Sequence, residues 1–453
     1  MNELPQAYIA QMKRLLGEAG FFAYEKALAE PVTRALRITL LLFPQGTPPC
    51  AIEGLGEAVP WAKGAYVIEG DARPGLSPLH EGGLYYMQEP SAMTAVSALC
   101  PQPGERVLDL CAAPGGKSTQ IAALMAGRGL LVCNEPVPSR AQILSRNVER
   151  MGVRNAVVTC ALPDQLAPRF PGFFDRILVD APCSGEGMFR RQIEARDEWS
   201  ENAPRGCADR QMEILEQAVR MLAPGGHMVY STCTFNDTEN EGVLERLLAA
   251  HPELTLAPFA LPGLPRAEAG YLHLYPHEMR GEGHFVSLLQ KRADAPAAPE
   301  PEKKKGKPSA RPAKAQERIE LPPVLAEGVA FERQVSAGGC LWSLPEGIDM
   351  ARLEGLRVLR TGLLLAHAEG RRVEPDHALA MALSPGEALR TASLTREQAL
   401  AYQAGEALDL GALPEGYTLM CCEGVSLGWG KQAGGMMKNH YPKGLRRSMT
   451  AGE

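Results

Sequence analysis

Two cysteines that follow two apolar runs are the residues of this chain best suited to covalent chemistry. The run 174–179 leads to Asp180 and then to Cys183, and the run 227–230 leads to Cys233. Residues just beyond the carboxyl ends of parallel strands face the ligand crevice of an open sheet. We therefore expect both thiols at one edge of a sheet, whereas most of the other cysteines should be inert small hydrophobes.

A pair of thiols suits the methylation of carbon 5 of cytosine, which is too electron-poor to attack a methyl sulfonium directly. A thiolate that adds at carbon 6 creates an enamine, and carbon 5 then becomes the nucleophile. Lys117 would favour the ionised sulfur, because a nearby cation lowers the pKa of a thiol. Asp180 could hold the ring nitrogen and amino edge of the base. The second thiol could take part in loss of the carbon 5 proton, which must precede release of the sulfur.

A loop of small residues between an apolar run at 107–110 and a helical segment at 118–125 predicts a ligand site. Small side chains let a ligand approach the backbone, and the helix N-terminus offers free N–H groups. Glu135 lies 19 residues after Gly116, where an acidic group commonly binds ribose hydroxyls. The loop matches neither dinucleotide nor ATP signatures, so it indicates only a nucleoside-bearing cofactor; the alternative is a tight turn with a surface glutamate. Its residues are Cys111, Ala112, Ala113, Pro114, Gly115, Gly116 and Lys117.

The composition of the chain predicts the domains that position these sites. Residues 81–292 alternate apolar strands with helical segments, which indicates a mainly parallel α/β sheet. A small α+β unit precedes it at 1–80, a Pro-, Ala- and Lys-rich linker follows at 293–320, and an α+β unit occupies 321–453. We expect basic patches in the linker and in the tail, where Trp429, His440 and Tyr441 interleave with cations as base-stacking surfaces require.

Composition excludes several classes of protein. The 453 residues are 45% hydrophobic, with no apolar run long enough for a membrane span or a signal peptide. The eleven cysteines form no CxxC pair or zinc-type set, so we expect no metal and a reducing, cytoplasmic location. A net charge of −6 argues only weakly against nucleic acid, because phosphate contacts depend on local patches.

Three segments carry a family resemblance. VLDLCAAPGGKS, LVDAPCSGEGMFR and VYSTCTFNDTENE closely resemble signature motifs of the Sun-type (Nol–Nop–Sun) RNA cytosine-C5 methyltransferases. The segment QEPSA resembles that family's opening motif. ALRITLL, LEGLRVLRTGLLL and the ending LGWGKQAGGMMKNHYPKGLR resemble the bacterial RsmF-like branch, which modifies small-subunit ribosomal RNA. The resemblance covers nearly the whole chain except the linker.

The resemblance implies a role for each matching residue. Cys233 would attack carbon 6, and Cys183 would assist release of the covalent RNA adduct. The loop from Cys111 to Lys117 would bind S-adenosyl-L-methionine, with Asp180 between cofactor and cytosine. Glu135 would hold the ribose, Arg140 would lie near the cofactor, and Pro276, His277 and the run 281–285 would line the far side of the site.

Two departures from the family pattern affect binding residues rather than the catalytic set. Thr159-Cys160-Ala161 replaces a Thr-Asn motif, so the adenine contact is either missing or provided by Asp164. Arg37-Ile38-Thr39 replaces an Arg-Val-Asn motif, which leaves the RNA contact of the N-terminal unit open.

The resulting expectation is a Rossmann-like S-adenosylmethionine methyltransferase domain with a mainly parallel, doubly wound sheet. A small N-terminal α+β domain and a C-terminal PUA-like RNA-binding module would flank it. Its partner would be RNA of the small ribosomal subunit, with no DNA or membrane partner, and the chain would act as a monomer. Two alternatives stay open: a DNA cytosine-C5 methyltransferase using Cys183, and a non-catalytic RNA-binding assembly factor.

Overall fold

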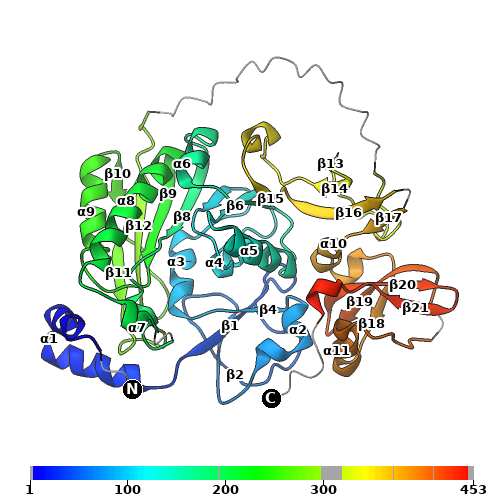
Figure 1. Cartoon of the computed structure of the whole chain (residues 1–453), viewed down its shortest axis with the longest axis horizontal. Helices are drawn as coiled ribbons and strands as arrows, with labels where there is room; N and C mark the ends of the chain where they lie inside the picture. Colours follow the sequence, from blue (N-terminus) through cyan, green and yellow to red (C-terminus); the bar gives the residue numbers. More distant parts are fainter. Residues whose placement is uncertain (1–3, 192–193, 297–318, 371, 412, 447–453) are drawn as a thin grey trace.

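The computed structural model describes residues 4–191, 194–296, 319–370, 372–411 and 413–446 (Figure 1). Most of the linker expected at 293–320, with its run of lysines, lies outside these residues. At the centre of the fold are five parallel strands in the order β7-β6-β5-β8-β9. They span Ala156–Thr159 (β7), Leu130–Asn134 (β6), Arg106–Asp109 (β5), Phe174–Asp180 (β8) and Leu222–Thr232 (β9). All residues of β6 and β7 are buried, as expected for apolar strands covered on both faces.

Antiparallel strands extend this sheet at both edges to nine strands. His284–Lys291 (β12) pairs with β9, and both Leu254–Leu256 (β10) and Tyr271–Leu274 (β11) pair with β12. At the other edge, Val358–Arg360 (β15) pairs with β7. β15 comes from the C-terminal half of the chain, so that half is joined to the methyltransferase sheet by backbone hydrogen bonds.

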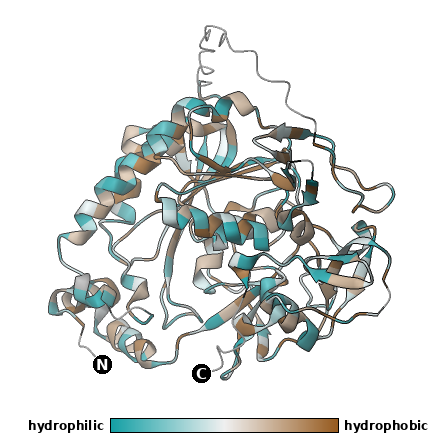
Figure 2. Ribbon diagram, turned by 45° about the vertical axis from the view of Figure 1, so that its right-hand side comes forward, coloured by the Kyte–Doolittle hydropathy of each residue, from teal (hydrophilic) through white to brown (hydrophobic). Residues whose placement is uncertain are grey.

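Helices cover both faces of the sheet and form two separate cores, which confirms the doubly wound architecture. The strands in the middle of the molecule are mostly hydrophobic, whereas the outer sides of the helices are hydrophilic (Figure 2). One core packs against α6 (Pro163–Leu166), α8 (Ala203–Met221) and α9 (Glu241–Ala250). The other packs against α3 (Thr94–Leu99), α4 (Gly116–Leu124) and α5 (Pro138–Arg150).

The N-terminal segment is divided between two places. Its four-stranded sheet has the order β2-β3-β1-β4 and runs from β1 (Arg34–Ile38) through β2 (Leu55–Ala58) and β3 (Ala65–Ile68) to β4 (Tyr85–Met87). The helix α1 (Gln6–Ala29), which is kinked at Gly17 (φ 70°, ψ 172°), packs instead against loops of the methyltransferase domain and lies to the left of this sheet in Figure 1. In the described residues, the core that α1 joins contains no residue of β1–β4.

Two further four-stranded sheets form the C-terminal half, with orders β13-β14-β16-β17 and β18-β19-β20-β21. The second shares a core with the N-terminal sheet, because Leu36 and Ile38 of β1 pack with Met420 and Val425. The first sheet comprises β13 (Gln334–Ala337), β14 (Cys340–Ser343), β16 (Leu363–Glu369) and β17 (Arg372–Pro375). The second comprises β18 (Thr391–Ser393), β19 (Gly416–Cys422), β20 (Val425–Ala433) and β21 (Met436–Asn439).

The expectation that Trp429 and Tyr441 offer surfaces for base stacking is wrong. Trp429 is 2% exposed and its indole Nε1 donates to the backbone carbonyl of Asp376 (2.9 Å), and Tyr441 is also buried. Both rings fill the core of the C-terminal module, because the hydrophobic gain of burying an aromatic ring is large. Lys431 and Lys438 remain at the surface, with the Lys431 ammonium 4.6 Å from the centre of the Tyr417 ring.

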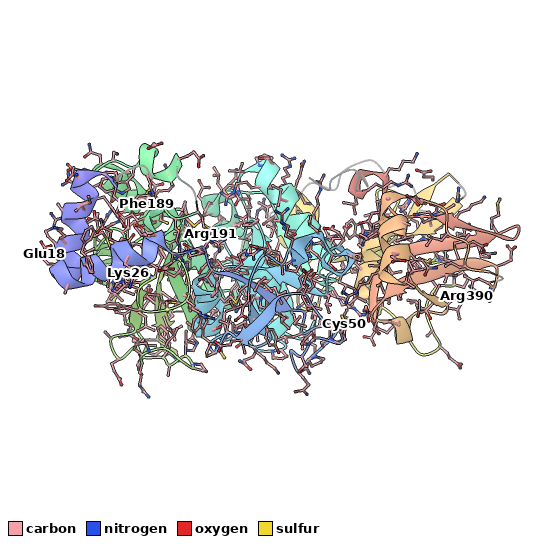
Figure 3. The ribbon with its side chains drawn as sticks, turned by 90° about the horizontal axis from the view of Figure 1, so that it is seen from below. Glu18, Lys26, Cys50, Phe189, Arg191 and Arg390 are labelled. Atoms are coloured by element: carbon pink, nitrogen blue, oxygen red, sulfur yellow. The ribbon has the colours of Figure 1, made fainter. Side chains whose placement is uncertain are left out.

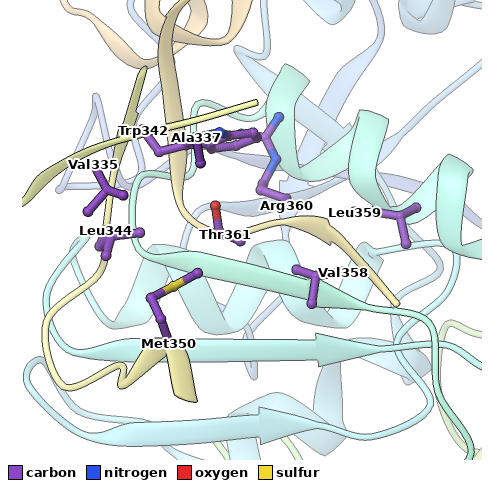
Figure 4. Close-up of a pocket in the computed structure, with 9 residues that line it drawn as sticks. All are labelled: Val335, Ala337, Trp342, Leu344, Met350, Val358, Leu359, Arg360 and Thr361. Atoms are coloured by element: carbon purple, nitrogen blue, oxygen red, sulfur yellow. The ribbon is translucent and has the colours of Figure 1, made fainter. Parts of the chain in front are cut away.

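A small cavity of about 130 Å³ lies between the first C-terminal sheet and β15 (Figure 4). Trp342, Met350 and Val358 line it, and Arg360 borders it while forming an ion pair with Glu149 of α5. The ion pair and the β15–β7 backbone pairing together fasten this half of the chain to the methyltransferase domain.

Candidate active site

The two cysteines are brought together at the carboxyl ends of adjacent parallel strands, as expected. β8 and β9 pair with Asp180 opposite Ser231, so the segments that follow them start side by side. The Sγ atoms of Cys183 and Cys233 are 3.2 Å apart. The backbone N–H of Gly187 also donates to the Cys233 carbonyl oxygen (2.8 Å), which links the two loops a few residues beyond the strands.

Asp180 lies beside this pair with both carboxylate oxygens engaged. Lys117 Nζ contacts Oδ2 at 2.8 Å, and the Ser231 hydroxyl donates to Oδ1 at 2.9 Å. His284 Nε2 lies 3.4 Å from the same Oδ1. Burial by itself would raise the pKa of Asp180, but Lys117 and His284 bring it well below its usual value. The carboxylate is therefore held ionised and oriented.

The thiols and Lys117 influence each other's protonation. Hydrogen bonding to Cys233, together with burial, raises the pKa of the Cys183 thiol well above its usual value. Burial opposes the charge on Lys117, but the Asp180 carboxylate and, more weakly, Cys233 raise the pKa of Lys117. Lys117 thus remains a cation within electrostatic reach of Cys233, and its role toward that thiol stays a prediction.

A cavity of about 800 Å³ opens beside the two cysteines, between β5 and β8, where the strand order reverses. Its volume falls within the range of roughly 300–1,000 Å³ that is typical of small-ligand pockets. Of the expected cofactor residues, Cys111, Ala113, Glu135, Arg140, Asp164 and Asp180 line it.

The cavity fits a nucleoside-bearing cofactor such as S-adenosylmethionine. Glu135 is 1% exposed, and its Oε1 accepts from the backbone N–H of Val137 (3.0 Å), which fixes the carboxylate on the wall. Arg140 reaches Glu135 (3.4 Å) and the carbonyl oxygen of Ala113 (3.2 Å). The exposed apolar side chains of Val137 and Leu162 line the same cavity as Asp164 and offer apolar contacts for a base. Carboxylates can accept hydrogen bonds from the ribose hydroxyls of an adenosine, and apolar walls can contact its base.

The glycines of the loop pack closely against neighbouring elements. A Cβ at Gly115 would lie 3.3 Å from Asn147 and Leu144 of α5, and one at Gly116 would lie 3.2 Å from Tyr86. Within the described residues, neither glycine lines the cavity, and neither do Ala112, Pro114 and Lys117. Their assignment as direct cofactor contacts therefore stays a prediction.

Arg37 connects the N-terminal sheet to the cofactor loop. It is buried, and its Nη2 donates to the Gly116 carbonyl oxygen (3.0 Å) and to the Thr119 hydroxyl (2.9 Å). Because Thr39 is buried as well, the Arg37-Ile38-Thr39 segment faces the interior. Arg37 thereby braces α4, whereas Ile38 packs in the core that the N-terminal sheet shares with the C-terminal half.

Sequence reasoning missed several residues that shape the site. Ser231 and His284 orient Asp180, and Arg210 of α8 lines the cavity near the thiols. Glu239 is buried and accepts from the Ser184 backbone N–H (3.0 Å) and from Gln211 (2.9 Å). Ser231 and Glu239 stand in the quoted third motif and His284 in the run 281–285, but only their spatial neighbours reveal what they contact.

Asp109, at the end of β5, gives a pH-dependent prediction. Burial raises its pKa to about 7, although the Ser118 hydroxyl donates to it at 2.7 Å. In the unfolded chain this carboxyl titrates near its ordinary pKa of about 3.9. Between these two values the folded state binds more protons, so stability falls as pH rises through this window.

We expect Asp109→Asn to remove this decline, because an amide does not ionise. Between pH 5 and pH 8 the wild-type chain should lose stability while the variant does not. The difference between their unfolding free energies should therefore shift by roughly 2–4 kcal/mol in favour of the variant. Urea denaturation at each pH measures the difference. Asp294→Asn, at an exposed position, is the control and should follow the wild type. A constant difference between Asp109→Asn and wild type across the pH range would contradict the prediction.

Two further features, a metal-binding cluster and a membrane-spanning helix, are absent from the described residues. They include no cluster of three or more His, Cys, Asp or Glu side chains that could hold a metal ion. Nor does any helix among them combine the length and the apolar character needed to cross a membrane.

The fold and the cavity define the class of protein: a Rossmann-like methyltransferase that uses S-adenosylmethionine, with two cysteines in the lining of its cavity. The family model described as 16S rRNA methyltransferase RsmB/F matches residues 96–290. Models of the RsmF N-terminal domain, first C-terminal domain and PUA domain match residues 4–90, 327–383 and 390–447.

Curated relatives identify the particular family. Ribosomal RNA small subunit methyltransferase F of Erwinia tasmaniensis is 34% identical, with 98% of this chain and 97% of the relative aligned. The Klebsiella pneumoniae protein of the same name is also 34% identical, with 98% and 96% aligned. The chain therefore belongs to the ribosomal RNA small subunit methyltransferase F family. This confirms the resemblance seen in the sequence motifs.

A solved structure agrees with the fold. The protein described as a methyltransferase homolog from Pyrococcus horikoshii is 30% identical and superposes with a TM-score of 0.54, covering 63% of this chain and 95% of that one. The likeness supports the methyltransferase fold assigned above.

Proposed function

We propose that this chain methylates carbon 5 of cytosine in small-subunit ribosomal RNA through a covalent intermediate on Cys233. The contact of 3.2 Å between Cys183 Sγ and Cys233 Sγ, beside a cofactor-sized cavity, carries this proposal. Bound S-adenosylmethionine supplies an electrophilic methyl group. Glu135, Arg140 and Asp164 would hold its nucleoside, and Asp180 would lie between it and the base.

Cys233 is the nucleophile in this mechanism. Its sulfur forms a bond to carbon 6, the double bond between carbons 5 and 6 opens, and carbon 5 becomes electron-rich. Lys117 supports this assignment, because the charge of an ionised Cys233 raises the pKa of Lys117. The two groups are therefore close enough to interact electrostatically. Asp180 is ionised and can accept hydrogen bonds from the amino group and a protonated ring nitrogen of cytosine.

Cys183 is proposed to act in the release step. In the free protein its proximity to Cys233 contributes most to raising its pKa. When Cys233 becomes a neutral thioether, that contribution is lost and the Cys183 thiol ionises more readily. The thiolate can then accept the carbon 5 proton, after which the carbon–sulfur bond breaks and the Cys233 thiolate returns.

The partner is proposed to be RNA, with no DNA or membrane partner. Membership of a family of ribosomal RNA methyltransferases supports RNA, and the model described as a PUA domain supports it as well. The target cytosine must be unpaired or flipped, because a thiol has to reach the face of its ring. We also propose a monomeric, cytoplasmic protein. The eleven cysteines are free wherever the structure describes them, which fits a reducing compartment.

A direct assay tests this function. Purified protein is incubated with labelled S-adenosylmethionine and unmodified small-subunit ribosomal RNA, both free and in assembled subunits, and with DNA of the same sequence. We expect label in 5-methylcytosine of RNA alone. Transfer to DNA would favour the DNA-methylating alternative, and RNA binding without transfer would favour a non-catalytic assembly factor.

A further inference from the structure

The N-terminal helix α1 packs on the loops that carry the two cysteines. Tyr8 and Tyr24 of α1 are fully buried, and their hydroxyls are 2.7 Å apart. The Tyr8 ring meets Phe189, which follows Cys183 in the chain, with ring centres 4.9 Å apart. The Tyr24 ring meets Phe235, which follows Cys233, at 5.8 Å. Figure 3 shows Phe189 and Arg191 beside α1.

A second contact connects α1 to the Cys183 loop. Arg190 Nη1 donates to the backbone carbonyl of Ala27, near the end of α1 (3.0 Å), and its Nε is 2.7 Å from the Glu282 carboxylate. Both Arg190 and Glu282 are largely shielded from solvent. Ion pairs shielded in this way hold their partners more firmly than exposed pairs do. The helix is therefore anchored at both ends.

Glu186 joins α1 and both cysteine loops at a single carboxylate. It lies three residues after Cys183 and is completely buried. Its Oε2 accepts from the backbone N–H groups of Phe235 (2.8 Å) and Asn236 (3.0 Å), just after Cys233. Its Oε1 accepts from Gln11 of α1 (2.9 Å) and from the Trp199 indole (3.2 Å). A buried carboxylate needs such a full set of donors to remain in place.

We propose that α1 is part of the catalytic apparatus and that Gln11 and Glu186 are positioning residues for the two thiols. This inference rests on the proposed function. Glu186 sets the spacing between the loops through backbone groups, and Gln11 locks the side of the carboxylate that faces α1. The cofactor cavity has no lining residue from α1. The helix should therefore influence the covalent step and leave cofactor binding unchanged.

The test is Gln11→Leu, which keeps the size of the side chain and removes its hydrogen-bond donor. We expect kcat for RNA methylation to fall about 5- to 20-fold, because small displacements of reacting groups are costly. The dissociation constant for S-adenosylmethionine should change less than about twofold. Adduct formation in a Cys183→Ala background should slow by the same factor as kcat. Gln6→Leu, at an exposed position of the same helix, is the control and should match the wild type.

A double-mutant cycle separates positioning from general destabilisation. Glu186→Ala should lower kcat more than Gln11→Leu, and adding Gln11→Leu to it should cause little further loss, because both act through one contact. Additive losses would overturn the proposal. So would an unchanged kcat in Gln11→Leu, or a parallel loss of kcat and cofactor affinity with a lowered unfolding temperature. Wild-type protein is assayed alongside the variants. If the proposed function is wrong, the wild-type protein transfers no methyl group, which distinguishes that failure from the outcomes above.

Discussion

The Cys233→Ala variant is expected to methylate RNA at least about 10³-fold more slowly than the wild-type chain, because it lacks the attacking sulfur. Without addition at carbon 6, carbon 5 stays too electron-poor to accept the methyl group. In the proposed mechanism Cys183 acts on the carbon 5 proton, so it does not replace the missing sulfur at carbon 6. Single-turnover transfer of labelled methyl groups to small-subunit ribosomal RNA measures the loss.

The control for this substitution is Cys340→Ala, which removes a cysteine from β14, far from the two thiols in the sequence and outside the cavity lining. It should retain wild-type activity, and Cys233→Ala should still bind S-adenosylmethionine with unchanged affinity. If Cys233→Ala remains active while Cys183→Ala is inactive, the roles of the two thiols are reversed, as in the DNA-type alternative.

The Cys183→Ala variant is expected to accumulate a covalent complex between protein and methylated RNA. Cys233 can still attack and carbon 5 can still receive the methyl group, but the thiolate that would take the carbon 5 proton is missing. Loss of a positioned base typically slows the affected step about 10²- to 10⁴-fold, so release becomes limiting. A denaturing gel should show a band of retarded protein that carries the methyl label and disappears after ribonuclease treatment.

The matched control is the double variant Cys183→Ala with Cys233→Ala, which should give no retarded band because the sulfur that forms the bond is absent. Normal turnover by Cys183→Ala, without an adduct, would assign proton removal to another group. The buried carboxylate of Glu239 would then be the next candidate, since its charge contributes to the raised pKa of Cys183.

Local sequence was sufficient to predict the catalytic centre because its parts lie at strand ends. Cys183 and Cys233 follow apolar runs that form parallel strands, and parallel strands place their carboxyl ends at one edge. Glu135 also follows a parallel strand, β6, and it lines the cavity. The expected runs 107–110 and 174–179 and the helical segment 118–125 agree closely with β5, β8 and α4, and the run 227–230 lies within the longer β9.

The same reasoning failed for aromatic residues and for hydrogen-bonding partners. Trp429 and Tyr441 stand among lysines in the sequence, yet both are buried, because their rings pack into two hydrophobic cores whose other members are distant in the chain. Glu186 is part of a recognised motif, but no spacing in the chain indicates that Gln11, 175 residues away, donates to it.

From the sequence alone the family could be recognised, and a chemistry with candidate residues could be predicted, because both depend on short motifs with local periodicity. Only the tertiary structure decided that the thiols approach to 3.2 Å, that α1 packs on their loops, and that the N-terminal and C-terminal sheets share a core. These features depend on which surfaces of distant elements fit together. That fit is set by side-chain shape and by the pairing of buried polar groups, and neither leaves a periodic signal in the chain.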